Sequence, residues 1–103
     1  MNEAEAALFG KAVGDVTRQK ILRFCSEKRR CVNDIAEHTG VKQPTATHHM
    51  QILTEAGLVI REVEGKQAFY LLNQQKFISC CGQLMVQLAP ENKATKAVCQ
   101  CCI

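Results

Sequence analysis

The sequence predicts a mainly α-helical winged helix-turn-helix fold that contains one small β-hairpin. Two short helical segments meet at a tight turn between Gly40 and Pro44. A hairpin signal follows around Gly65, and an amphipathic segment after the hairpin ends at Pro90. Together, these three observations predict four helices, two strands and a final helix, in the order ααααββα.

The length and charge of the chain limit what it can be. Its 103 residues support one domain with a modest core, so we expect a homodimer that buries additional surface. Thirteen Lys and Arg against ten Asp and Glu give a net charge of +3, which is weak evidence for a polyanionic partner. Because we find no signal-peptide pattern and no apolar run of membrane-spanning length, we expect a cytoplasmic protein without membrane contact.

The first two predicted helices are separated by Gly14. Residues 2–13 carry apolar side chains at helical spacing, and Gly14 is expected to end this helix. Asp15 is a typical N-cap for the second helix. Cys25 falls on the apolar face of the second helix, so we interpret it as a small buried hydrophobic residue.

The third and fourth predicted helices form the helix-turn-helix. The third runs from Cys31 to Thr39, and Gly40 follows it in the usual position for ending a helix. Pro44 suits the first turn of the fourth helix, and Gly57 suits its end. A connection this short between two helices is typical of a helix-turn-helix.

A hairpin, a last helix and a tail complete the predicted chain. Residues 58–63 and 67–72 are rich in strand-forming side chains and flank a Gly-containing loop, which predicts the wing. Residues 74–89 predict the last helix, so the folded domain is expected to span 1–89 and residues 90–103 to form a flexible, Cys-rich tail. The apolar stripe of the last helix contains Phe77, Ile78, Cys81, Leu84, Met85 and Leu88.

The fourth helix has the composition of a DNA recognition helix. At about 100° per residue, its apolar side chains face inward while hydrogen-bonding side chains face outward. No acidic residue occurs from Val41 to Thr54 to repel phosphate, although an ordinary solvated helix face would also be polar. A wing tip directly after this helix favours the DNA interpretation. The predicted DNA contacts are Lys42, Gln43, Thr45, Thr47, His48, Gln51 and Lys66.

The chemistry of these side chains suits a duplex. Gln51 can bond an adenine edge at two points, and Thr47 can meet a phosphate or a thymine methyl group. Lys42 lies near the N-terminus of the helix, where phosphates are favoured, and Lys66 at the hairpin tip can reach the neighbouring backbone or minor groove. We therefore predict binding to double-stranded operator DNA.

Three segments resemble the arsenical-repressor (ArsR/SmtB) family: Gly14-Asp15-Val16-Thr17-Arg18, Gln43-Pro44-Thr45-Ala46-Thr47-His48-His49 and Ala56-Gly57-Leu58-Val59. The resemblance covers residues 5 to about 89. It implies a homodimeric repressor whose first and last helices pair the subunits, and whose operator is released by a soft metal, a metalloid or an oxidant. The chain departs from the family pattern at Val16, where Pro is usual, and at Lys42, where Ser often caps the recognition helix.

Two effector sites known in that family do not match this chain. A third-helix arsenite site needs two thiols, whereas Cys31-Val32-Asn33-Asp34-Ile35 supplies one, so we interpret Cys31 as a packing or capping residue. A zinc site on the last helix needs Asp, His or Glu, and residues 74–89 contain none of them. The predicted effector site therefore depends on other cysteines.

The remaining cysteines predict a mobile thiolate site. Helical projection puts Cys81 at the centre of the apolar stripe of the last helix, where simple packing at the dimer seam is the alternative to ligand binding, and Cys80 about 100° away on the polar side. Ten residues of flexible tail span about 17 Å, against about 14 Å of helix from Cys80 to Ala89, so tail thiols can reach the helix. Thiolates select soft ions, and trivalent arsenic takes up to three sulfurs. The predicted ligands are Cys80, Cys81, Cys99, Cys101 and Cys102.

We therefore expect a DNA-binding repressor that is released by arsenite, antimonite or an organoarsenical such as methylarsenite. Two alternatives keep the DNA binding but change the signal: a redox switch that forms a disulfide or persulfide, and a cadmium or zinc thiolate sensor. An enzyme is not expected, because the formal C-x-x-C from Cys99 to Cys102 lacks its βαβ context. A winged helix that binds only proteins would show no salt-sensitive binding to a duplex.

Overall fold

The structure is a computed structural model that describes residues 1–90. Its helices are α1 (Glu3–Val13), α2 (Val16–Glu27), α3 (Val32–Thr39), α4 (Gln43–Glu55) and α5 (Gln74–Leu88). Its strands are β1 (Arg30–Cys31), β2 (Val59–Glu64) and β3 (Gln67–Leu72). The predicted helices and hairpin are confirmed, whereas the short strand β1 was not expected. The predicted tail, with Cys99, Cys101 and Cys102, lies outside the described residues, apart from Pro90.

Local capping explains where the helices begin and end. The Asp15 carboxylate accepts a hydrogen bond of 3.0 Å from the Arg18 backbone N–H, which confirms Asp15 as the N-cap of α2. Asn73 caps α5 in the same way through the N–H of Lys76. Gly40 ends α3 with a φ of 74°, a left-handed conformation that glycine adopts without steric cost.

The sheet has the strand order β1-β3-β2 and is antiparallel throughout. β2 and β3 form the predicted wing, and the turn between them contains Gly65 with a φ of 64°. β1 pairs with the other edge of β3, where Arg30 lies opposite Tyr70 and Cys31 lies opposite Phe69. Two residues of strand carry almost no periodic signal, so sequence patterning cannot identify β1.

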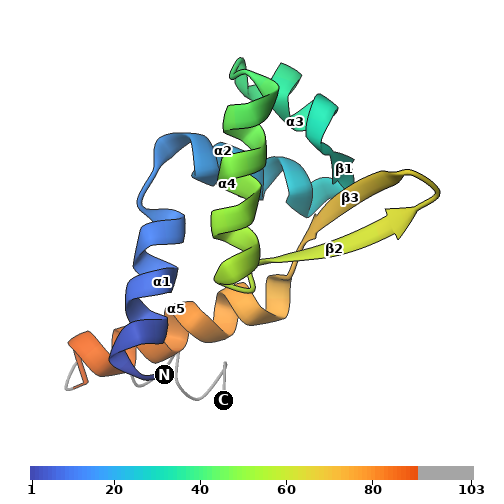
Figure 1. Ribbon diagram of the computed structural model, residues 1–103. Coiled ribbons are helices and arrows are strands. Elements are labelled where there is room, and N and C mark those ends of the chain that lie inside the picture. Colours follow the sequence, from blue (N-terminus) through green and yellow to red (C-terminus); the bar gives the residue numbers. More distant parts are fainter. Residues whose placement is uncertain (91–103) are drawn as a thin grey trace.

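Figure 1 shows how these elements are arranged. Helix α1 stands upright and crosses α5, which runs along the bottom of the view; α4 stands in the middle of the molecule, and the hairpin of β2 and β3 projects to the right. Phe9 of α1 meets Phe77 of α5 edge to face, with ring centroids 5.9 Å apart. None of the helices in the described part is long and apolar enough to cross a membrane.

Candidate DNA-binding surface and effector thiols

The recognition helix α4 has one buried face and one exposed face, as its sequence predicts. Ala46, Met50 and Leu53 are almost completely buried in the core, with exposures of 0%, 1% and 0%. Every residue that was predicted to contact DNA is exposed: Lys42, Gln43, Thr45, Thr47, His48 and Gln51 on α4 and its N-cap, and Lys66 on the wing.

The beginning of α4 is suited to an anion. Lys42 is the N-cap, but its side chain makes no capping hydrogen bond; its backbone carbonyl instead accepts the first helical hydrogen bond, from Ala46. Lys42 directly precedes the first turn of α4, whose backbone N–H groups have no partner inside the helix. Together with the helix dipole, these groups favour a phosphate at this end of α4.

His49 plays a different part from its neighbour His48. His49 is half-buried, and its Nδ1 lies 3.1 Å from a terminal nitrogen of Arg18. Burial lowers the pKa of His49, and the nearby charges of Arg18 and His48 lower it further, while Asp15 opposes them. His49 therefore stays neutral at neutral pH, with Nδ1 as the acceptor of the Arg18 hydrogen bond.

Arg18 joins the end of α1 to the recognition helix. Besides its contact with His49, its guanidinium donates to the carbonyls of Ala12, at 3.0 Å, and Lys11, at 2.6 Å. These carbonyls belong to the last turn of α1, where no further helical N–H is available to them. The sequence does not predict this connection, because residues 18 and 49 are 31 positions apart and neither carries a local signal for the other.

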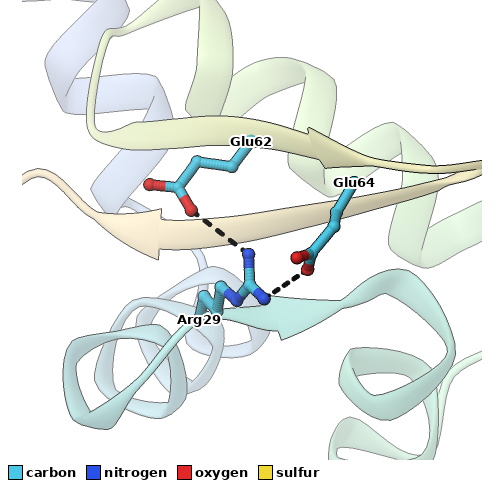
Figure 2. Close-up of polar contacts among 3 residues, drawn as sticks. All are labelled: Arg29, Glu62 and Glu64. Atoms are coloured by element: carbon cyan, nitrogen blue, oxygen red, sulfur yellow. Dashed lines mark hydrogen bonds and ion pairs between the residues drawn. The ribbon is translucent and has the colours of Figure 1, made fainter.

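The wing carries both signs of charge. Lys66 lies in the turn, and Arg61, Glu62 and Glu64 are exposed on β2. Figure 2 shows the Arg29 side chain, which comes from the connection between α2 and β1, reaching both wing carboxylates. The guanidinium lies 3.5 Å from Glu62 and 2.5 Å from Glu64. The sequence analysis did not single out Arg29.

Two of the thiols are core residues. Cys25 is completely buried, which confirms its interpretation as a small hydrophobic residue, and this burial raises its pKa to about 11. Cys31 ends β1 and precedes α3; it is 6% exposed and forms no side-chain cap. The packing alternative for Cys31 therefore holds. A thiol in either position is poorly suited to act as an accessible thiolate.

Of the two thiols of α5, Cys80 does not lie where the sequence predicted it. Cys80 was expected on the polar side of the helix, but it is 3% exposed and belongs to the hydrophobic core. Cys81 was expected at the centre of the apolar stripe, with packing at the dimer seam as the alternative; in the single chain it is half-buried and packs at the margin of the core. The prediction for Cys80 was wrong because α5 packs this residue beside the beginning of α1 and the end of α4, whereas Ile78 of the apolar stripe is 52% exposed.

Cys80 also borders a small cleft. The cleft has a volume of about 150 Å³ and lies between the beginning of α1, the end of α4 and α5. Within residues 1–90, no three side chains of His, Cys, Asp or Glu are grouped closely enough to hold a metal ion. The cleft is lined by Met1, Glu5, Leu8, Glu55, Ala56, Gly57, Lys76 and Cys80.

Comparison with known proteins agrees with this geometry. Residues 15–61 match the family described as bacterial regulatory protein, arsR family. The transcriptional repressor SdpR of Bacillus subtilis is 36% identical over 63 residues, which cover 61% of this chain and 70% of SdpR. The chain belongs to the ArsR family. An ArsR-family relative, the arsenical resistance operon repressor of Staphylococcus aureus, is 34% identical over 73 residues, which cover 71% of this chain and 70% of that repressor.

A solved ArsR-like structure has the same fold. It is the homodimeric winged helix-turn-helix DNA-binding domain of a possible ArsR-family transcriptional regulator from Mycobacterium bovis. It is 26% identical, has a TM-score of 0.68, and the match covers 88% of this chain and 84% of that one. As a member of the ArsR family, the protein is a DNA-binding transcriptional regulator and not an enzyme.

Proposed function

We propose that this protein is a homodimeric repressor that leaves its operator when a thiophilic metalloid or metal binds cysteines of α5 and of the C-terminal segment. The preferred inducers are trivalent arsenic, trivalent antimony and methylarsenite. The observation that carries the proposal is the position of Cys80, which lines the same cleft as the end of the recognition helix. A ligand on that thiol acts directly on the element that reads DNA.

Operator binding is supported by the exposed face of α4. Its side chains are of medium length and form hydrogen bonds, and residues 41–54 include no carboxylate. Such a face can read base edges in the major groove, while Lys42 and Lys66 bind phosphate. Gln51 is the main candidate for base recognition, because Gln can make two hydrogen bonds to an adenine edge.

Dimerisation through α1 and α5 is supported by their exposed apolar side chains. Leu8 on α1 is 40% exposed, and Ile78 and Leu88 on α5 are 52% and 72% exposed. The homodimeric Mycobacterium bovis domain has the same fold. A two-fold pair of recognition helices would then meet two half-sites about one helical turn of DNA apart.

The inducer site is proposed to combine a thiol of α5 with thiols of the C-terminal segment. Soft thiolates prefer arsenic, antimony, cadmium and mercury to hard cations. One helix thiol and two others complete the three sulfurs of a trivalent metalloid, and a resistance repressor for arsenicals is among the relatives. The proposed ligands are Cys80 or Cys81 with Cys99, Cys101 and Cys102.

Binding at Cys80 would be coupled to DNA release through the cleft. Because Cys80 is 3% exposed, its sulfur can bind a metalloid only if the beginning of α1 moves away from α5. The same movement changes the surroundings of Glu55 and Gly57, where α4 ends. To shift the protein from 99% bound to 99% released, the inducer must favour the released state by about 5.5 kcal/mol.

The test is release of DNA by inducers. The purified dimer is titrated with a fluorescent duplex from its own upstream region, and then with arsenite, antimonite, methylarsenite, cadmium or peroxide. We expect release by the trivalent metalloids in oxygen-free buffer that contains a monothiol reductant. The Cys99→Ser/Cys101→Ser/Cys102→Ser variant should bind the duplex with unchanged affinity but should not be released. The Thr95→Ala/Lys96→Ala variant, which keeps all thiols of the same segment, is the matched control.

Three outcomes would replace this function. Release by peroxide but not by arsenite would favour the redox switch, and release by cadmium or zinc alone would favour a tetrahedral thiolate sensor. If arsenite released the triple variant from DNA at the same concentration as the wild type, the C-terminal thiols would be excluded as ligands.

A further inference from the structure

The charge of the wing is poorly matched to DNA. Within residues 59–72, two basic residues, Arg61 and Lys66, are balanced by two acidic residues, Glu62 and Glu64. A hairpin without excess positive charge gains little from phosphates, and its carboxylates are repelled by them. The recognition helix shows no such balance, since residues 41–54 lack acidic side chains altogether.

Arg29 changes this balance from outside the wing. One nitrogen of its guanidinium donates to a Glu62 oxygen at 3.5 Å, and another donates to a Glu64 oxygen at 2.5 Å. Glu62 and Glu64 are two positions apart on β2, so their side chains lie on the same side of the strand. Figure 2 shows both carboxylates turned toward the one guanidinium that lies between them.

Arg29 is also fixed in position by an aromatic ring. Its guanidinium carbon lies 4.3 Å from the centroid of the Phe69 ring, a cation–π distance. Phe69 is the β3 partner of Glu62 and also pairs with Cys31 of β1, so the ring lies where β1 and the wing meet. This geometry requires the flat fork of arginine, which can stack on a ring and bind two carboxylates together.

The ion pairs contribute little to stability. The side chains of Arg29, Glu62 and Glu64 are 42%, 49% and 65% exposed, and water weakens an attraction between charges at such exposures. Their effect on a nearby polyanion is larger, because two unpaired carboxylates close to phosphate repel it, and salt screens this repulsion only beyond about 10 Å at 0.1 M.

We propose that Arg29 is a positioning residue of the DNA-binding surface, which offsets one of the two negative charges of Glu62 and Glu64 and holds both carboxylates on one side of the wing so that its basic tip can approach phosphate. This proposal rests on the proposed function in one respect, that the wing lies against operator DNA. It does not depend on the identity of the inducer. It adds to the DNA-binding surface a residue that belongs to neither α4 nor the wing.

The experiment is a charge cycle in which affinity for the operator duplex is measured at several salt concentrations. Arg29→Ala should weaken binding by about tenfold at 0.1 M salt, because it exposes two carboxylates to phosphate. Arg23→Ala is the matched control: it removes the same charge from an exposed position on α2, and within residues 1–90 Arg23 takes part in no ion pair. It should weaken binding by no more than about twofold.

The decisive arm combines these changes with Glu62→Gln/Glu64→Gln. In that background, Arg29→Ala should cost no more than Arg23→Ala, because no carboxylate remains to be neutralised. Arg29→Lys should retain only part of the affinity, since it keeps the charge but not the flat fork that contacts both carboxylates. A role for Arg29 in holding the fold of the wing alone would not be rescued by removing the carboxylates.

Two results would overturn the proposal. One is an equal effect of Arg29→Ala and Arg23→Ala in the wild-type background. The other is a full effect of Arg29→Ala in the Glu62→Gln/Glu64→Gln background, which would mean that Arg29 binds DNA itself. If Arg29→Ala fails to fold, the variant Glu62→Gln/Glu64→Gln still tests the proposal. An affinity for the operator duplex equal to that of the wild type would mean that the two carboxylates do not lie near DNA. Arsenite release, assayed on the same proteins, separates these results from failure of the proposed inducer.

Discussion

The recognition helix α4 and the last helix α5 differ in how well their sequences predict their faces. The inward and outward residues of α4 are as predicted, with Leu53 fully buried and Gln51 exposed. In α5, Cys80 was expected on the polar side but is in the core, and its neighbour Cys81 is at the margin of the core. An apolar stripe identifies a buried face only when the helix has a single apolar contact.

The composition of α5 explains the difference. Its apolar residues occupy more than one side, so that Cys80 can pack inward while Ile78 and Leu88 remain exposed. A helix of this kind can contact its own core on one side and a second subunit on the other. Both contacts contribute apolar residues to the same sequence pattern, so the pattern alone does not show which residue faces the core and which faces a second subunit. The three predictions below test this contrast, from the largest expected effect to the smallest.

The first prediction separates the two faces of α4. Leu53→Ala should lower the free energy of unfolding by about 2–5 kcal/mol, because it leaves a cavity in the core. Gln51→Ala should change that free energy by less than about 0.5 kcal/mol, yet it should weaken operator binding by about 1–3 kcal/mol. Urea unfolding and DNA titration measure the two quantities. Loss of stability in Gln51→Ala, or unchanged DNA affinity, would contradict the assignment of the faces.

The second prediction compares the two thiols of α5. Cys80→Ser puts a hydroxyl group into the core and should lower the free energy of unfolding by about 1–3 kcal/mol. Cys81→Ser should cost less than about 1 kcal/mol, because its site is half-buried. Thermal and urea unfolding of both variants at one protein concentration provide the measurement. Equal costs would show that a second surface buries Cys81 as completely as the core buries Cys80.

Local signals account for most of what the sequence predicted. Asp15 and Gly40 mark helix boundaries through the backbone groups that they satisfy or the conformations that they allow, so they can be read without a structure. The pairing of Arg29 with Glu62 and Glu64 crosses 33 and 35 positions, and that of Arg18 with His49 crosses 31. Such pairs depend on how separate elements pack together, so the local sequence around either residue does not predict them.

The third prediction concerns the pH dependence of the half-buried His49. Because its folded pKa lies below the value in the unfolded chain, its contribution to stability is complete above pH 6.5 and is lost as the pH falls through the folded pKa. The lowered pKa of Asp15, caused mainly by the backbone N–H of Arg18, has the same sign but acts below pH 3.8. Urea unfolding between pH 7.5 and 5 should therefore show a smaller acid-induced loss in His49→Gln than in the wild type.

The control for this pH dependence is His48→Gln, because His48 is exposed on the same helix. That variant should lose stability on acidification about as much as the wild type. If His48→Gln, and not His49→Gln, reduced the acid-induced loss of stability, the assignment of this loss to His49 would be wrong.

Arg18 has a mechanical consequence that goes beyond its three hydrogen bonds. It joins the last carbonyls of α1 to the His49 side chain in the middle of α4, so we expect these two helices to move together. A rotation of α1 at the proposed dimer interface would then be transmitted to the recognition helix α4. A displacement too small to disturb the fold would therefore suffice to move both recognition helices of a dimer out of register with the major grooves of the DNA.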